Sequence, residues 1–86
     1  MVTTAFGKAE VTEQVTLKQR AGGKQFATLV QLLEDEKGEL LVRFAYATDG
    51  TARRGPVTLR RADLERLRAA LRKTPKLAAV LDLAGV

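Results

Sequence analysis

The residues of this chain that could take part in chemistry are mostly Lys and Arg, because the usual catalytic groups are missing. The 86 residues include no His, no Cys and no Ser, so the common nucleophiles and the common base near neutral pH are absent. We therefore expect a protein that is not an enzyme. The lack of Cys also excludes a disulfide framework and a thiolate zinc site, and we expect no cofactor and no bound metal.

The Lys and Arg residues are unevenly distributed along the chain. Residues 51–86 contain nine of them against three acidic residues, whereas residues 1–50 contain six against seven. A surface of one sign attracts polyanions whatever the fold beneath it. The charge distribution therefore favours nucleic acid or acidic lipid as a partner.

Basic residues also stand at the ends of several predicted strands, where they can converge in space. If Phe26 or Tyr46 is exposed among them, the surface combines phosphate neutralisation with stacking, which suits single-stranded nucleic acid; the alternative is that these rings belong to the core. We assign Phe44 to the core, because it lies between Val42 and Tyr46 on an apolar face. The candidate nucleic-acid-binding residues are Lys18, Arg20, Lys24, Phe26, Arg43, Tyr46, Arg53 and Arg54.

Two strands joined by a glycine turn are predicted in the first half of the chain. From Val11 to Arg20, apolar residues at odd positions alternate with polar ones at even positions, which is typical of a half-buried strand. The residues at 21–23 include two glycines that can adopt positive φ. A second strand, rich in apolar residues, is predicted from Lys24 to Leu33, so the two strands form a hairpin.

A third and a fourth strand follow the charged loop at residues 34–39, which lacks the ligand spacing of a dedicated metal site. The third strand is predicted at residues 40–47, with one fully apolar or aromatic face, and we expect it to be central in the sheet. After a turn at residues 48–51, Pro56 suits the start of the fourth strand, in which Val57 and Leu59 face inward.

A helix is predicted after Leu59, because the apolar period changes there. Leu64, Leu67 and Leu71 form one stripe on a helix of about three turns. Pro75 is expected to bend or restart this helix, and a short second segment then runs through Leu77, Val80 and Leu81.

The sequence thus predicts a single domain of the α+β class, spanning residues 1–86 with a flexible N-terminus at residues 1–8. Its architecture is a four-stranded, curved antiparallel sheet followed by a C-terminal helix, in the order ββββα. The longest purely apolar run is five residues, Leu77 to Leu81, and the start of the chain has no secretory signal pattern. We therefore expect a soluble, cytoplasmic and nucleoid-associated protein.

Residues 23 to 71 resemble a known family. The run Arg53-Arg54-Gly55-Pro56-Val57-Thr58-Leu59, followed by Leu64 and Leu67, resembles the end of the positive cofactor 4 family of transcriptional coactivators and its short bacterial members. The run Gly38-Glu39-Leu40-Leu41-Val42-Arg43-Phe44 resembles that family's Gly-led third element. No tryptophan follows the third strand here, and Arg60 stands where a capping Thr or Asn is usual.

This resemblance implies a homodimer whose helices help form the interface and whose sheets present a groove for single-stranded DNA. Carried over by position, it implies that basic and aromatic residues of three strands contact the DNA. Lys18 and Arg20 are added from the alternation of their strand alone. The residues that the resemblance itself implies are Lys24, Phe26, Arg43, Tyr46, Arg53 and Arg54.

The leading hypothesis is a dimeric module that binds single-stranded DNA or RNA in transcription, replication or repair. Transcription or replication proteins are further candidate partners, and no membrane partner is expected. One alternative is a protein-interaction or dimerisation module that uses the third strand and the tail from Leu77 to Leu83. The other is duplex DNA binding through the helix, which carries Arg61, Arg66, Arg68 and Arg72.

Overall fold

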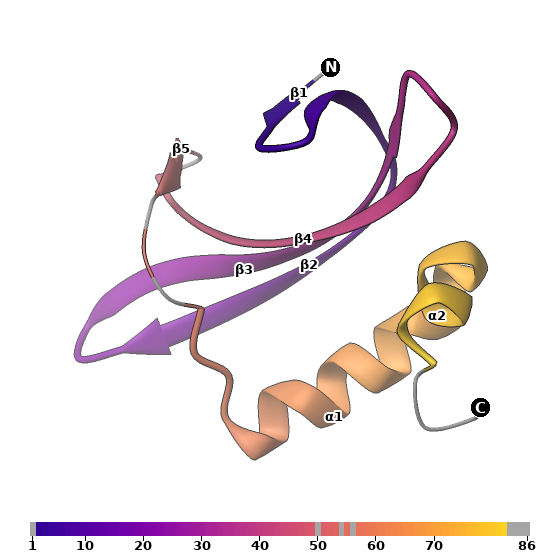
Figure 1. Cartoon of the computed structure of the whole chain (residues 1–86). Coiled ribbons are helices and arrows are strands. Elements are labelled where there is room, and N and C mark those ends of the chain that lie inside the picture. The colour runs from indigo at the N-terminus through magenta and orange to yellow at the C-terminus, as the bar shows by residue number, and fades with distance from the viewer. Residues whose placement is uncertain (1, 50, 54, 56, 83–86) are drawn as a thin grey trace.

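The computed structural model describes residues 2–49, 51–53, 55 and 57–82, which form a curled antiparallel sheet followed by helices on one side of it (Figure 1). This arrangement confirms the predicted α+β class. Neighbouring strands of the sheet are also neighbours along the chain. The elements are β1 (Val2–Thr4), β2 (Gly7–Ala21), β3 (Lys24–Asp35), β4 (Leu40–Thr48), β5 (Thr51–Arg53), α1 (Arg61–Ala70), the 3₁₀ turn η1 (Leu71–Lys73) and α2 (Pro75–Leu81).

The hairpin of β2 and β3 is the longest part of the sheet, and its glycine turn is as predicted. Gly22 and Gly23 have φ angles of 56° and 80°, which a side chain would disfavour. Val15 and Leu17 are buried, as their odd positions predicted. Val11 is instead 39% exposed, because the pairing of β2 with β3 shifts register between Val11 and Glu13 and so breaks the alternation.

The strand β1 is an element that the alternation did not reveal. It pairs with the start of β2, placing Val2 opposite Ala9. The turn between the two strands is held by Thr4, whose Oγ1 accepts a hydrogen bond from the Phe6 amide at 3.0 Å and donates one to the Gly7 carbonyl at 2.8 Å. Residues 2–4 are thereby attached to the sheet.

The last strand lies earlier in the chain than predicted. β5 ends at Arg53, and residues 57–60 are not in a strand, so the predicted strand at Val57 to Leu59 is wrong. Gly55, with a φ of 136°, lies where the chain leaves the sheet, and Leu59 packs against the core beneath the helices. This segment crosses from the sheet to the helical layer.

The strand β4 is confirmed, but it is not central along its whole length. β3 runs along it from Leu40 to Ala47, whereas β5 pairs only with Tyr46, Ala47 and Thr48. Phe44 is 47% exposed, so its assignment to the core is wrong. The reason is that the two helices contact mainly β2 and β3, which leaves this part of β4 uncovered.

The helices pack on the sheet through a slightly different face from the predicted one. The core consists of Val15, Leu17, Val30, Leu32, Leu67 and Leu77. The helix restarts at Pro75 as expected, but Leu64 is 51% exposed. α1 turns Asp63 and Leu67, which are four residues apart, toward the sheet, because Asp63 has polar partners there.

Candidate nucleic-acid interface

The structure divides the predicted binding residues between the two faces of the sheet. Cross-strand pairing places Lys18, Arg20 and Arg43 on the face opposite the helices, which we call the open face. Arg54 lies outside the described residues. The other four predicted residues belong to the helix-side face, and they are Lys24, Phe26, Tyr46 and Arg53.

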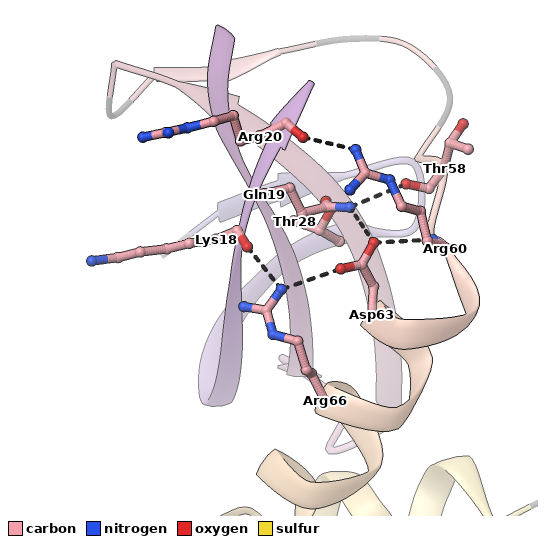
Figure 2. A network of polar contacts seen from close by, with 8 residues as sticks. All are labelled: Lys18, Gln19, Arg20, Thr28, Thr58, Arg60, Asp63 and Arg66. Carbon is pink, nitrogen blue, oxygen red and sulfur yellow. Dashed lines mark hydrogen bonds and ion pairs between the residues drawn. The ribbon is translucent and has the colours of Figure 1, made fainter. Parts of the chain in front are cut away.

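Lys18 and Arg20 border a shallow hollow of about 680 Å³ on the open face. Both side chains are exposed and extend in the same direction, away from α1 (Figure 2). The floor of the hollow is apolar and includes Leu29, and Asp49 is the acidic residue at its edge. The full lining is Thr16, Lys18, Gln19, Arg20, Gln25, Phe26, Ala27, Leu29, Ala47 and Asp49.

A second groove, of about 330 Å³, lies on the helix-side face at the same end of the sheet. It brings together Lys24, Phe26 and Tyr46, and both rings are half-buried. Gly55 passes close to the tyrosine, since a Cβ at this position would lie 3.3 Å from the Tyr46 hydroxyl. The lining consists of Lys24, Gln25, Phe26, Thr28, Tyr46, Thr48, Val57 and Thr58.

The two hollows meet at Gln25 and Phe26, which line both of them. They therefore lie on the two sides of one hairpin end, residues 18–26. This end carries three basic residues, and the chain contains no Asp or Glu between Glu13 and Glu34. Asp49 is the one acidic residue among the described residues that line the two hollows, so the charge there is net positive and attracts a polyanion.

Arg43 lies away from the hairpin end, whereas Arg53 pairs with Tyr46 of the helix-side groove, and both arginines have polar neighbours. The Nε atom of Arg43 donates to Gln31 Oε1 at 2.8 Å, and Gln31 Nε2 donates to Gln14 Oε1 at 2.6 Å. These three side chains form a row across β4, β3 and β2 on the open face. Arg53 is exposed, and its Nε atom donates to Thr48 Oγ1 at 2.6 Å.

A polar network beneath the hairpin end joins α1 to the sheet (Figure 2). Its centre is Asp63, whose Oδ2 accepts hydrogen bonds from the Arg60 amide at 3.0 Å and from Gln19 Nε2 at 2.9 Å. Gln19 also donates to the Thr58 carbonyl at 3.4 Å and accepts from the Thr28 hydroxyl. Each buried polar group of this network thus has a partner, as burial requires.

The carboxylate of Asp63 is stabilised in its charged form. The Arg60 backbone amide, above all, lowers the pKa of Asp63, with further lowering by the Gln19 amide and by the charges of Arg60 and Arg66, against an opposing effect of burial. Arg66 Nη1 lies 3.2 Å from Asp63 Oδ1. At neutral pH the network therefore holds an ionised acid.

Arg66 of α1 and Arg60, the N-cap residue of α1, hold the backbone of Lys18 and Arg20, and we call these two residues the helix arginines. Arg66 Nη1 donates to the Lys18 carbonyl at 2.9 Å, and Arg60 Nη2 donates to the Arg20 carbonyl at 2.7 Å. Figure 2 shows both helix arginines reaching the strand from the side opposite the Lys18 and Arg20 side chains. The helix arginines therefore position the residues that border the open-face hollow.

The sequence interpretation missed this positioning role. One usable signal was present, because an acid three residues after a helix N-cap commonly accepts a hydrogen bond from the cap amide, as Asp63 does from Arg60. The contact of Gln19 with Asp63 and the contact of Arg66 with the Lys18 carbonyl had no such signal, since each joins residues more than 40 positions apart in the chain.

Comparison with known proteins identifies no relative. No family model, no curated protein and no solved structure matches this chain. In the described part of the chain, no helix has both the length and the apolar character needed to cross a membrane. The resemblance to the positive cofactor 4 family therefore rests on the sequence motifs alone, and the choice of a function rests on the geometry of the hairpin end.

Proposed function

We propose that this protein binds single-stranded nucleic acid, DNA in the first place, through the hairpin end at residues 18–26, and that it is not an enzyme. The observation that carries the proposal is the pair of hollows that meet at Phe26, with Lys18 and Arg20 on one side and Lys24 on the other. The protein acts as a homodimer in transcription, replication or repair.

The binding mode follows from the chemistry of the two hollows. Lys and Arg side chains neutralise phosphates, and the resulting release of counterions supplies most of the sequence-independent affinity. Phe26 and Tyr46 line the helix-side groove, where an unstacked base finds aromatic surface. A flexible single strand can follow both sides of a narrow hairpin, whereas a stiff duplex contacts only one.

The structure gives less support to duplex binding through α1. Arg66 is engaged with Asp63 and with the Lys18 carbonyl, and Arg60 is engaged with the Arg20 carbonyl. These two guanidinium groups would have to break internal contacts in order to bind phosphates. Arg61, Arg68 and Arg72 remain exposed on the helical segments.

The proposal is tested by titrating labelled single-stranded and duplex oligonucleotides of equal length with the protein and following fluorescence anisotropy. We expect tighter binding of the single strand, and an affinity that falls about 20-fold between about 50 mM and about 200 mM salt if three phosphates are neutralised. Binding to neither oligonucleotide, or a weak dependence on salt, would contradict the proposal. A preference for the duplex would favour α1 instead.

A matched pair of variants locates the site. Lys18→Met should weaken single-strand binding and reduce the slope of log K against log salt by about 0.7 to 1. Lys37→Met, in the exposed turn between β3 and β4, removes the same charge far from the hairpin end. Equal effects of the two variants would show that only net charge matters.

A further inference from the structure

We propose that two copies of this chain pair antiparallel through the outer edges of their β4 strands, joining the two sheets into one. The inference rests on the homodimer in the proposed function but is independent of nucleic-acid binding. It also differs from the interface that the family resemblance implies, in which the helices make the contact. β4 has an open edge, an incompletely covered apolar face and a residue pattern that is complementary to itself.

The outer edge of β4 lacks a strand neighbour over most of its length. Within the described residues, β5 pairs with β4 only from Tyr46 to Thr48, so no strand accompanies residues 40–45 on that side. An exposed edge presents a row of backbone donors and acceptors that readily pairs with another strand. Only an extended chain satisfies such a row, which excludes a lipid or a compact apolar ligand as the occupant.

The helix-side face of the same segment is apolar and incompletely covered. Leu40 is 49% exposed and Phe44 is 47% exposed, and Val42 between them is only partly buried. The helices contact mainly β2 and β3. Large apolar side chains next to an open edge gain burial when a second strand is added beside them, at about 25 cal/mol for each Å² removed from water.

The opposite edge of the sheet is covered at its two ends, and between them β2 carries the acidic residues Glu10 and Glu13. β1 pairs with the start of β2, and farther along β2 the carbonyls of Lys18 and Arg20 accept hydrogen bonds from Arg66 and Arg60. Charged groups and covering elements are common means of blocking edge pairing. β4 carries a single charged residue, Arg43, whose side chain is bonded to Gln31.

The residue pattern favours a second copy in a register that pairs residues 40–44 of the two strands, centred on Val42. An antiparallel pair centred on Val42 places Leu40 opposite the partner's Phe44 on the apolar face, and Leu41 opposite the partner's Arg43 on the open face. The register centred on Arg43 would oppose two guanidinium groups, which is unfavourable. A shift by one residue would place apolar side chains opposite the polar face. The Val42 register also continues the open face from one copy to the other.

The absence of Cys allows a direct test by single-cysteine crosslinking. Val42→Cys places two thiols opposite each other across the two-fold axis, within the Cα separation that a disulfide accepts. We expect this variant to form a covalent dimer under mild oxidation, and Leu64→Cys, exposed on α1, to remain a monomer on a denaturing gel. Preferential crosslinking of Arg43→Cys would overturn the Val42 register. Preferential crosslinking of Leu64→Cys would overturn the β4 interface.

Light scattering after gel filtration measures the mass of the protein in solution and is a second test that needs no cysteine variant. The wild-type protein should elute with twice the mass of the chain, and Phe44→Glu should elute as a monomer with an unchanged far-ultraviolet circular dichroism spectrum. A monomeric wild-type protein would overturn the inference. A monomer that still binds single strands would contradict the dimer but support nucleic-acid binding. A dimer that binds no nucleic acid would support the β4 interface but contradict nucleic-acid binding.

Discussion

Arg66 Nη1 lies 2.9 Å from the main-chain carbonyl of Lys18, and the same atom lies 3.2 Å from the carboxylate of Asp63. One guanidinium group therefore connects a helix, an ionised acid and the strand that carries the proposed phosphate contacts. Since the Lys18 side chain points away from this contact, Arg66 acts on binding through the backbone and not by touching the nucleic acid (Figure 2).

Replacing Arg66 by Met should weaken single-strand binding by about two- to ten-fold, which corresponds to the net value of one hydrogen bond, about 0.5–1.5 kcal/mol. Arg66→Gln retains an amide donor without the charge, and it should restore part of the affinity. Anisotropy titration measures both variants. If Arg66 instead bound phosphate directly, the Gln variant would be as weak as the Met variant.

Two comparisons separate positioning from charge. Arg68→Met removes the same charge from an exposed site on α1, and it should affect binding less than Arg66→Met. In a double-mutant cycle, Lys18→Met and Arg66→Met should be non-additive, because both act on the same contact. Additive losses would mean that the two residues contribute independently.

Acid should destabilise the protein through Asp63. The pKa of this carboxyl is lowered from its ordinary value of 3.8, so the charged form is favoured in the folded state. Its contribution to stability is present above the unfolded pKa and is lost as the pH falls through the lower, folded pKa. Thermal unfolding followed by circular dichroism should therefore show a wild-type Tm that declines below about pH 4.

The variant Asp63→Asn tests the origin of this acid sensitivity. It should have a lower Tm than the wild type at neutral pH and a smaller decline of Tm in the acid range. Glu65→Gln is the control, because it removes a carboxylate from an exposed position on the same helix. An acid decline in the Asp63 variant as steep as in the wild type would assign the effect to other groups.

Glu13 should stabilise the start of α2. Its Oε1 accepts a hydrogen bond from the Leu77 amide at 2.7 Å, and so satisfies one of the free amides at the helix N-terminus. Glu13→Ala should lower the free energy of unfolding by about 1 kcal/mol, as loss of a capping contact does. Denaturant unfolding measures this change, with Glu10→Ala, exposed on the same strand, as the control with little effect.

Alanine substitutions at Leu77 and Leu64 test how the helices pack on the sheet. Leu77 is fully buried in the core, whereas Leu64 is 51% exposed. Leu77→Ala should reduce the free energy of unfolding by about 2–5 kcal/mol, through lost burial and a residual cavity. Leu64→Ala should change it by less than about 1 kcal/mol. A similar loss of unfolding free energy in the two variants would mean that Leu64 is buried and that α1 packs through the stripe of Leu64, Leu67 and Leu71.

The local elements were largely readable from the sequence. Alternation along β2 and β3, two glycines between them, and a change of period before α1 are properties of neighbouring residues, so they do not depend on the rest of the fold. The proline at position 75 likewise predicted that the helix restarts there. The basic character of residues 18–24 follows from composition in the same way.

Only the tertiary structure decided which residues face each other. It separated Lys18 and Arg20 from Lys24 and Phe26 by placing them on opposite faces of one hairpin, because side-chain direction depends on strand register. It also exposed Phe44, since coverage by the helices depends on where they pack.

The tertiary structure also decided the orientation of α1. A leucine stripe permits several rotations of a helix, and the contact between Asp63 and Gln19, 44 positions apart, selected the observed one. The sequence by itself therefore determined the elements and their charge, through interactions between residues close in the chain. Folding determined the faces, the edges and the network, because these depend on contacts between residues that are distant in the chain.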